Sequence, residues 1–127
     1  LVKKIIQAGK NVLNSRVLVM GATFKEDVSD IRNSKVVDVV NELRSYGITV
    51  DVTDPLASSE ELKEEYGFEL IPEVNSSYDA VIVAVAHKQY LKLDEKYFES
   101  ITGDSGILMD VKGIFRTKID NLTYMSL

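Results

Sequence analysis

Two basic side chains and an aromatic one stand close together in a polar segment that follows a short apolar run. Phe24 and Lys25 come first, and Arg32 follows just before an expected helix. A lysine ammonium group, together with free backbone N–H groups, is suited to hold a diphosphate. Lys112, which follows a later apolar run, is a second lysine of this kind. The pattern predicts an anion site; the alternative is a solvated surface loop with its phenylalanine tucked into the core.

The remaining candidates for chemistry are few, because the chain has one histidine and no cysteine. It therefore offers no thiol nucleophile, no disulfide and little for a transition-metal site, and we expect neither a catalytic residue nor a metal ligand. A lone histidine such as His87 is more often a hydrogen-bonded structural residue than a catalyst. Asp54, which precedes Pro55, is expected to shape that turn rather than to bind a ribose.

Length and composition indicate one compact globular domain. The chain has 127 residues, of which 45% are hydrophobic and 28% charged, and its formal net charge is −5. Such an acidic chain has no electrostatic reason to coat nucleic acid or anionic lipid. No apolar run approaches the roughly 20 residues that a membrane-spanning helix needs. We expect a cytoplasmic protein that binds neither nucleic acid nor membrane.

Apolar runs and helical periodicities alternate along the chain. Strands are expected at 16–20, 49–53, 68–71 (a weak one), 79–86 and 106–110. Helices are expected at 34–46, 58–66 and from 94 to about 103, capped by Asn33 or Ser34, by Ser58 and by Asp94. The tail after Ile114 is assigned no element. This order predicts an α/β fold with a Rossmann-like open parallel sheet of about five strands and helices on both faces.

The division of the chain follows from the same pattern. Residues 1–13 are expected to be the end of a linker helix from a preceding domain, and residues 14–127 to form the domain itself. Ligands of open parallel sheets bind beyond the carboxyl ends of the strands. Four segments should meet there, namely Gly21–Asn33, Asp54–Ser58, Ala86–Tyr90 and Asp110–Arg116. Lys25 and Lys112 should therefore lie on one edge, where they could share one anion.

The first of these loops lacks the glycine fingerprint of dinucleotide-binding folds. Thr23 and Glu26 stand where the second and third glycines of G-x-G-x-x-G would be. A nicotinamide dinucleotide held tightly against a glycine turn is therefore not expected in this chain.

A family resemblance is carried by this loop, which reads Gly21-x-x-Phe24-Lys25-x-Asp27-x-x-Asp30-x-Arg32-x-Ser34. It resembles the signature that opens the C-terminal, UDP-sugar-binding domain of the UDP-glucose/GDP-mannose dehydrogenase family. Asp54-Pro55 and Asp110-Val111-Lys112-Gly113 fall where that family has similar elements, so the resemblance covers about residues 14–120. The Asp-Val-Lys-Gly sequence and Ala86-His87-Lys88 look more like the members that oxidise UDP-N-acetylhexosamines.

The resemblance implies a longer enzyme with an N-terminal NAD-binding domain, a central dimerisation domain and this C-terminal domain. The whole enzyme is expected to be a homo-oligomer. Such an enzyme is an NAD-dependent UDP-sugar 6-dehydrogenase of polysaccharide precursor biosynthesis. It oxidises the sugar C6 alcohol to a uronic acid through a cysteine of the central region.

The same resemblance implies roles for four residues. Phe24 and Lys25 would contact the UDP-sugar, and Arg32 would reach the NAD side of the cleft between domains. Lys112 would stand where many members have an arginine that meets the nucleotide-sugar. Because the chain lacks both the cysteine and the glycine fingerprint, it is expected to bind the sugar nucleotide without turnover.

Two other protein classes share this expected fold. A receiver-like signalling domain needs acidic residues at the end of its first strand to hold Mg²⁺, but Met20-Gly21-Ala22 stand there. A non-catalytic interaction domain would have kept the fold and lost the ligand, and the presence of Phe24, Lys25 and Arg32 argues against it.

Overall fold

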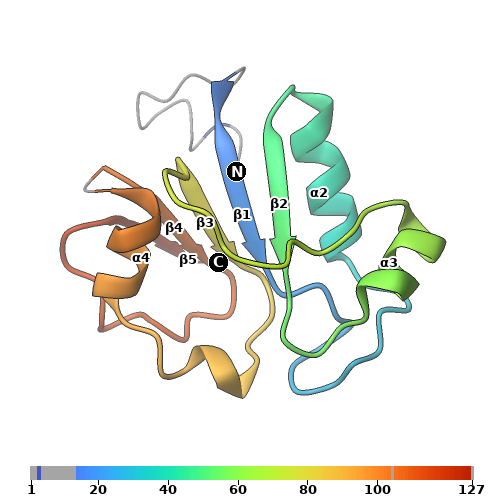
Figure 1. The fold of residues 1–127 in the computed structure, drawn as a ribbon. Helices are drawn as coiled ribbons and strands as arrows, with labels where there is room; N and C mark the ends of the chain where they lie inside the picture. The colour runs from blue at the N-terminus through green and yellow to red at the C-terminus, as the bar shows by residue number, and fades with distance from the viewer. Residues whose placement is uncertain (1–2, 4–13, 104, 127) are drawn as a thin grey trace.

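The computed structural model describes residues 3, 14–103 and 105–126. The linker helix expected over residues 1–13 lies outside the described residues, apart from Lys3. The described elements follow one another as strands and helices in alternation over most of the chain (Figure 1). They are β1 (Arg16–Met20), α2 (Val36–Ser45), β2 (Thr49–Thr53), α3 (Ser59–Tyr66), β3 (Ala80–Val83), the 3-10 turn η2 (Lys88–Tyr90), α4 (Glu95–Thr102), β4 (Ile107–Asp110) and β5 (Thr123–Ser126).

The five strands form one sheet in the order β2-β1-β3-β4-β5, and every neighbouring pair is parallel. In the middle of the sheet Val17 of β1 lies opposite Val50 of β2 on one side and Ala80 of β3 on the other. The chain first moves outward from β1 to β2 and then crosses back to β3, so the strand order reverses beside β1. The predicted α/β fold with an open parallel sheet is confirmed.

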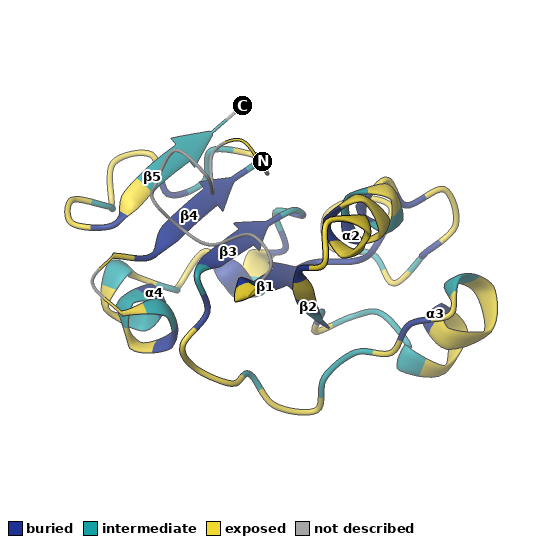
Figure 2. Cartoon of the chain, turned by 90° about the horizontal axis from the view of Figure 1, so that it is seen from above, coloured by how far each residue is buried: buried dark blue, intermediate teal, exposed yellow. Residues whose placement is uncertain are grey.

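The sheet is buried on both faces because successive side chains of each strand point to opposite sides. Val17 and Val19 of β1 belong to the apolar cluster that contains residues of α2 and α3. Leu18 and Met20 belong to the cluster that contains residues of α4. Seen from above, the buried sheet runs between α2 on one side and α4 on the other (Figure 2). The prediction of helices on both faces is confirmed.

The predicted number of strands is correct, but one of the five lies elsewhere in the chain. Residues 68–71 are not a strand, although the N–H of Ile71 donates to the carbonyl of Val52 over 2.9 Å. The N–H of Leu70 instead donates to the hydroxyl of Ser59 on α3, and Pro72 has no N–H to continue a ladder. The fifth strand is β5, in the tail for which the sequence predicts no element, and it pairs with β4.

Two of the predicted helix caps are confirmed and the third is wrong. The side chains of Ser58 and Asp94 accept from the N–H groups of Glu61 and Tyr97 and so cap α3 and α4, as predicted. Helix α2 begins after Lys35 without a side-chain cap, so the expected cap by Asn33 or Ser34 is wrong. Asn33 has a φ of 59°, and the Ser34 hydroxyl is buried with no hydrogen-bond partner. The loop after β1 thus leads into α2 without a side-chain cap.

Candidate functional site

A cleft of about 250 Å³ opens at the carboxyl ends of β1, β3 and β4, beside the point between β1 and β3 where the strand order reverses. Its walls come from the loop after β1, from the start of α2 and from the segments that follow β3 and β4. Val36, Ile82 and Val85 give the cleft an apolar floor. This crevice is the position at which open parallel sheets bind their ligands.

Gly21 allows the loop after β1 to leave the sheet close to the segment that follows β3. Its φ is +102°, and a Cβ atom at this position would lie only 2.7 Å from Cβ of Val85. A larger residue would push these two walls apart. The position that a side chain at residue 21 would take is therefore filled by Val85.

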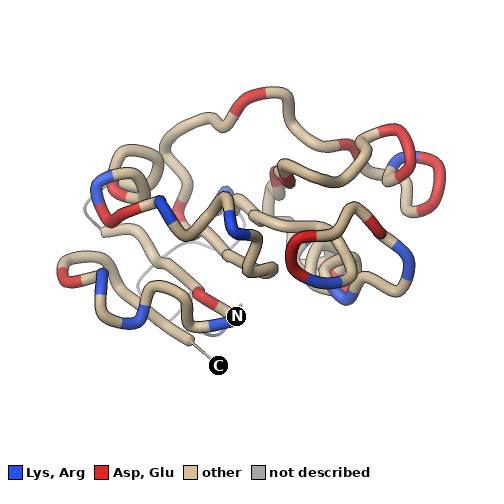
Figure 3. Tube along the Cα trace, turned by 90° about the horizontal axis from the view of Figure 1, so that it is seen from below, with Lys and Arg blue, Asp and Glu red and all other residues tan. Residues whose placement is uncertain are grey.

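Lys25 and Lys112 both line the cleft, although they come from opposite ends of the chain. Both are exposed, so their ammonium groups can turn towards a ligand. Lys35, at the start of α2, adds a third lysine, and Glu26 is the one acidic residue in the described lining. Figure 3 views the tube from below, where basic and acidic positions are interspersed along the loops. The two lysines from which the sequence predicts an anion site thus line the same cleft.

Phe24 projects from the same loop into solvent. Its side chain is 54% exposed, so the alternative in which it is tucked into the core is wrong. Phe24 lines the cleft and also a neighbouring hollow of about 140 Å³, which it shares with Asp30, Arg32 and Asn33. An exposed ring between two hollows is a surface on which a planar or apolar part of a ligand can rest.

Arg32 lies in that second hollow rather than in the cleft with the lysines. Its Nε donates to Asp30 Oδ1 over 3.1 Å and its Nη2 to Oδ2 over 3.0 Å, a bidentate pair. The hydrogen bonds from Arg32 hold the pKa of Asp30 below its usual range, and the same pairing raises the pKa of Arg32. The two hydrogen bonds to Asp30 hold one edge of the guanidinium, and the Arg32 side chain is 83% exposed, so the rest of the group faces solvent.

Asp54 and His87 form a buried polar pair below the loop. Nε2 of His87 lies 2.9 Å from Oδ2 of Asp54, and both side chains are fully buried. Oδ1 of Asp54 accepts the N–H groups of Leu56 and Ala57, and Oδ2 accepts that of Ala22. Asp54 therefore shapes its own turn, as predicted, and also ties it to the loop after β1. His87 is a hydrogen-bonded structural residue, again as predicted.

Three residues near the site are not indicated by the sequence pattern. Lys35 falls within the predicted helix, although it stands at the point where the preceding loop reaches the cleft. Thr23 and Asp27, which contact His87, have no predicted role beyond their place in the loop. Thr23 is only 1% exposed. A hydroxyl residue next to the exit of a buried strand is the one signal that could have indicated a buried polar contact.

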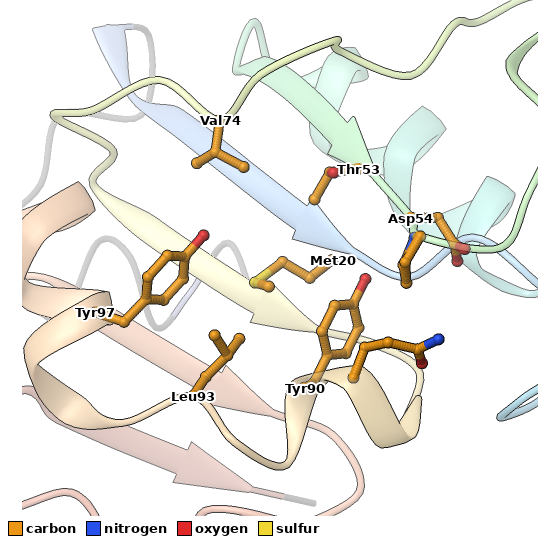
Figure 4. A pocket seen from close by; sticks show the side chains of 9 residues that line it. Met20, Thr53, Asp54, Val74, Tyr90, Leu93 and Tyr97 are labelled. Atoms are coloured by element: carbon orange, nitrogen blue, oxygen red, sulfur yellow. The ribbon is translucent and has the colours of Figure 1, made fainter.

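A further hollow of about 240 Å³ lies on the opposite face of the sheet, between the ends of β1 and β2 and the segment from η2 to α4 (Figure 4). Met20, Leu93 and Tyr97 give it an apolar character. The Tyr90 hydroxyl is buried there without a hydrogen-bond partner. Burial, with a smaller contribution from Asp54, raises the pKa of Tyr90 far above its usual range, so this hydroxyl keeps its proton.

The described part of the chain contains neither a metal cluster nor a membrane span. No group of three or more His, Cys, Asp or Glu side chains lies close enough together in residues 3, 14–103 and 105–126 to hold a metal ion. No helix within these ranges is long and apolar enough to cross a membrane.

Comparison with known proteins identifies a family model and sequence relatives that match this chain. Residues 18–117 match the model of the UDP-glucose/GDP-mannose dehydrogenase family, UDP binding domain. The chain is 44% identical over 113 residues to a UDP-N-acetyl-D-glucosamine 6-dehydrogenase of Salmonella typhi, and 40% identical over 113 residues to one of Pseudomonas aeruginosa. In each case the match covers 88% of this chain and 27% of the relative. The chain thus spans about a quarter of the length of these curated relatives.

Solved structures show the same fold. A UDP-D-ManNAc dehydrogenase from Pyrococcus horikoshii superposes with a TM-score of 0.78 at 17% identity. An NDP-N-acetyl-D-galactosaminuronic acid dehydrogenase from Methanosarcina mazei Go1 superposes with a TM-score of 0.81 at 19% identity. Both superpositions cover 98% of this chain and 28% of the other.

Proposed function

We propose that this chain, which belongs to the UDP-glucose/GDP-mannose dehydrogenase family as its UDP binding domain, holds the diphosphate of a UDP-sugar between Lys25 and Lys112. The observation that carries the proposal is that both lysines line one cleft at the reversal of strand order. A diphosphate attracts ammonium groups from two sides, and its interaction with each is a charge-assisted hydrogen bond. Phe24, which is exposed beside Lys25, supplies an apolar surface for the rest of the ligand.

Arg32 is assigned to the cofactor side of the site. Asp30 occupies Nε and Nη2 of the guanidinium. The remaining edge of the group faces solvent, where an anionic group of NAD held by another domain can approach it. The paired carboxylate fixes the plane of the guanidinium and so reduces the entropy lost when it binds.

The described residues do not fit NAD as a ligand of this chain alone. Thr23 and Glu26 replace the glycines of a dinucleotide fingerprint, and Val85 occupies the space next to Gly21. We therefore place most of the NAD site in an N-terminal domain of a longer chain. NAD, when bound there, supplies the hydride acceptor for the oxidation, and this chain orients the sugar nucleotide.

The proposed parent protein is an NAD-dependent UDP-sugar 6-dehydrogenase that converts the C6 alcohol to a uronic acid in polysaccharide precursor biosynthesis. It comprises an NAD-binding domain, a central dimerisation domain that supplies the cysteine and makes it a homo-oligomer, and this domain. The names of its relatives from Salmonella typhi and Pseudomonas aeruginosa support a UDP-N-acetylhexosamine as the substrate.

The proposal is tested by titrating the chain with UDP and following backbone amide signals by NMR. Lys25→Ala and Lys112→Ala should each weaken binding by on the order of tenfold, the worth of about 1.5 kcal/mol for a hydrogen bond to a charged group. Lys96→Ala is the matched control, because Lys96 is also an exposed lysine, on α4, and lies outside the cleft. If neither cleft variant changes the affinity, or if the control changes it equally, the assignment is wrong.

A further inference from the structure

His87 uses both of its ring nitrogens inside the protein. Nδ1 accepts the backbone N–H of Asp27 over 3.0 Å, so this nitrogen carries no proton. The ring proton is therefore on Nε2, which points between Asp54 Oδ2 at 2.9 Å and Thr23 Oγ1 at 3.2 Å. With no exposed surface and both nitrogens engaged, the imidazole has no free position for a ligand or for proton transfer to a substrate.

The two loop residues that contact His87 stand on either side of Phe24 and Lys25. Thr23 precedes them, and its hydroxyl proton goes to the backbone carbonyl of Lys25 over 2.8 Å. Because that proton is used, the Thr23 oxygen is the acceptor in its contact with His87. A continuous path of two hydrogen bonds thus runs from the imidazole to the backbone of Lys25.

Asp27 closes the loop on the other side. Its φ of 60° places it in the left-handed region, which aspartate tolerates better than most residues. Its N–H donates to His87, and its Oδ1 accepts the N–H of Lys88 over 2.8 Å. This reciprocal pair fastens the turn after Lys25 to the segment that follows β3.

We propose that His87 is a positioning residue for the sugar-nucleotide site, which holds Lys25 in the cleft through Thr23 and Asp27 while Asp54 fixes the imidazole. This inference rests on the proposed function of the cleft and deepens it. A loop held in its bound conformation loses less conformational entropy when the diphosphate arrives, so its ligand binds more tightly. The histidine thereby contributes to affinity without touching the ligand.

The test compares His87→Ala with His87→Asn by NMR titration with UDP. The alanine variant loses the contacts with Thr23 and Asp27 on the loop. It should weaken UDP binding about fivefold, the equivalent of one hydrogen bond. In the asparagine variant, Oδ1 takes the position of Nδ1 and can still accept the N–H of Asp27, but the contact with Thr23 stays lost, so part of the affinity should return. Val81→Ala, a core truncation on the face of α4, controls for general loss of stability and should leave the UDP affinity unchanged.

A double variant shows whether His87 acts through Lys25. In a chain that already carries Lys25→Ala, adding His87→Ala should cause little further loss, because the residue that it positions is gone. Full additivity of the two losses would overturn the inference. An unchanged affinity in His87→Ala, alongside a weakened one in Lys25→Ala, would overturn it too while leaving the proposed function intact. An unchanged affinity in Lys25→Ala would defeat the proposed function itself.

Thr23→Val keeps the inference testable if His87→Ala does not fold. Valine has the shape of threonine but removes the hydroxyl between the imidazole and the Lys25 carbonyl. It should weaken UDP binding by part of the loss expected of His87→Ala, whereas Thr23→Ser should not. Equal affinities of the valine and serine variants would contradict the path.

Discussion

The hydroxyl of Tyr124 donates to Oδ2 of Asp110 over 2.6 Å and so joins strand β5 to the end of β4. The same carboxylate oxygen accepts the N–H of Phe115 over 2.7 Å. Asp110 is fully buried, and the turn that it organises carries Lys112 into the cleft. Burial and the carboxylate of Asp110 raise the pKa of Tyr124 to about 12, so the hydroxyl remains a donor throughout the neutral range.

Removing this hydroxyl should cost stability. Tyr124→Phe is expected to lower the free energy of unfolding by about 1 kcal/mol, because Asp110 loses one of its two donors. Chemical denaturation measures the change. Tyr46→Phe is the matched control, since the Tyr46 side chain is 50% exposed. Equal stabilities of the two variants would show that the bond contributes nothing.

Glu95 anchors the turn before β5 from the first turn of α4. Its Oε2 accepts the N–H groups of Asp120, Asn121 and Leu122, at 2.9, 2.7 and 3.1 Å. Partial desolvation acts to raise the pKa of Glu95, but the three donors outweigh it and hold that pKa below its usual range. Because the folded-state pKa is the lower one, the stabilisation is present above about pH 4.5 and is lost as the pH falls.

Glu95→Gln should therefore lower the melting temperature at pH 7, and its difference from the unaltered chain should shrink under acid. Thermal unfolding from neutral pH down to the acid range measures this trend. Glu99→Gln, on the same helix, is the control. A difference that stays constant over the whole range would contradict the role of the charged carboxylate.

Tyr78 should make stability fall in alkali. Its hydroxyl donates to Asp51 over 2.6 Å, and burial together with this contact raises its pKa to about 12. A folded-state pKa above the usual 10 means that the stabilisation is complete below about pH 10 and disappears as the pH rises towards 12. Over that interval the chain should lose on the order of 2 kcal/mol relative to Tyr78→Phe. Urea titrations at a series of pH values measure the difference in stability between the chain and Tyr78→Phe. A difference that stays constant as the pH rises towards 12 would contradict the expectation.

Gly21→Ala should be among the most destabilising single changes in the chain. The new Cβ would meet Val85 at 2.7 Å and would also require a φ of +102°. We expect a loss of roughly 2–4 kcal/mol from the combined clash and strain. Gly67→Ala separates the two effects, because Gly67 has a φ of +82° but no atom within 4 Å of the position that a new Cβ would take. It should lose only about 1 kcal/mol; similar losses in both variants would mean that Val85 moves aside.

The chain should bind UDP-sugars without oxidising them. It has no cysteine and no glycine fingerprint for NAD, so mixtures with NAD and any UDP-sugar should show no increase in absorbance from reduced NAD. Detectable reduction, absent from a sample without the sugar nucleotide, would overturn this division of labour.

The central strands and the capped helices could be predicted because each is determined by its own residues. The runs at 16–20 and 49–53 coincide with β1 and β2, and the caps at Ser58 and Asp94 require only a side chain and a nearby N–H. Strand β5 could not be predicted in this way. Its four residues TYMS owe their conformation to the open edge of β4, a partner that is distant in sequence.

The site could be predicted in part for a similar reason. Phe24, Lys25 and Lys112 follow strands whose carboxyl ends are expected at one edge of the sheet, so the sequence predicts that they lie close together. All three line one cleft. The contacts of His87 with Thr23 and Asp27 depend on how two loops pack, which no local pattern encodes. The sequence shows that Asp30 is near Arg32, but not that both oxygens of this carboxylate accept hydrogen bonds from one edge of the guanidinium.

The carboxylate of Asp54 makes hydrogen bonds to three separate stretches of the chain, at Ala22, at residues 56–57 and at His87. The binding loop is therefore not a module that can be transferred on its own. A protein engineer who exchanged residues 22–33, to retarget the cleft towards another anion, would have to keep the backbone N–H groups of positions 22 and 27 where Asp54 and His87 accept them. The hydroxyl of Thr23 would have to stay as well, because it is the side chain of this segment that contacts His87.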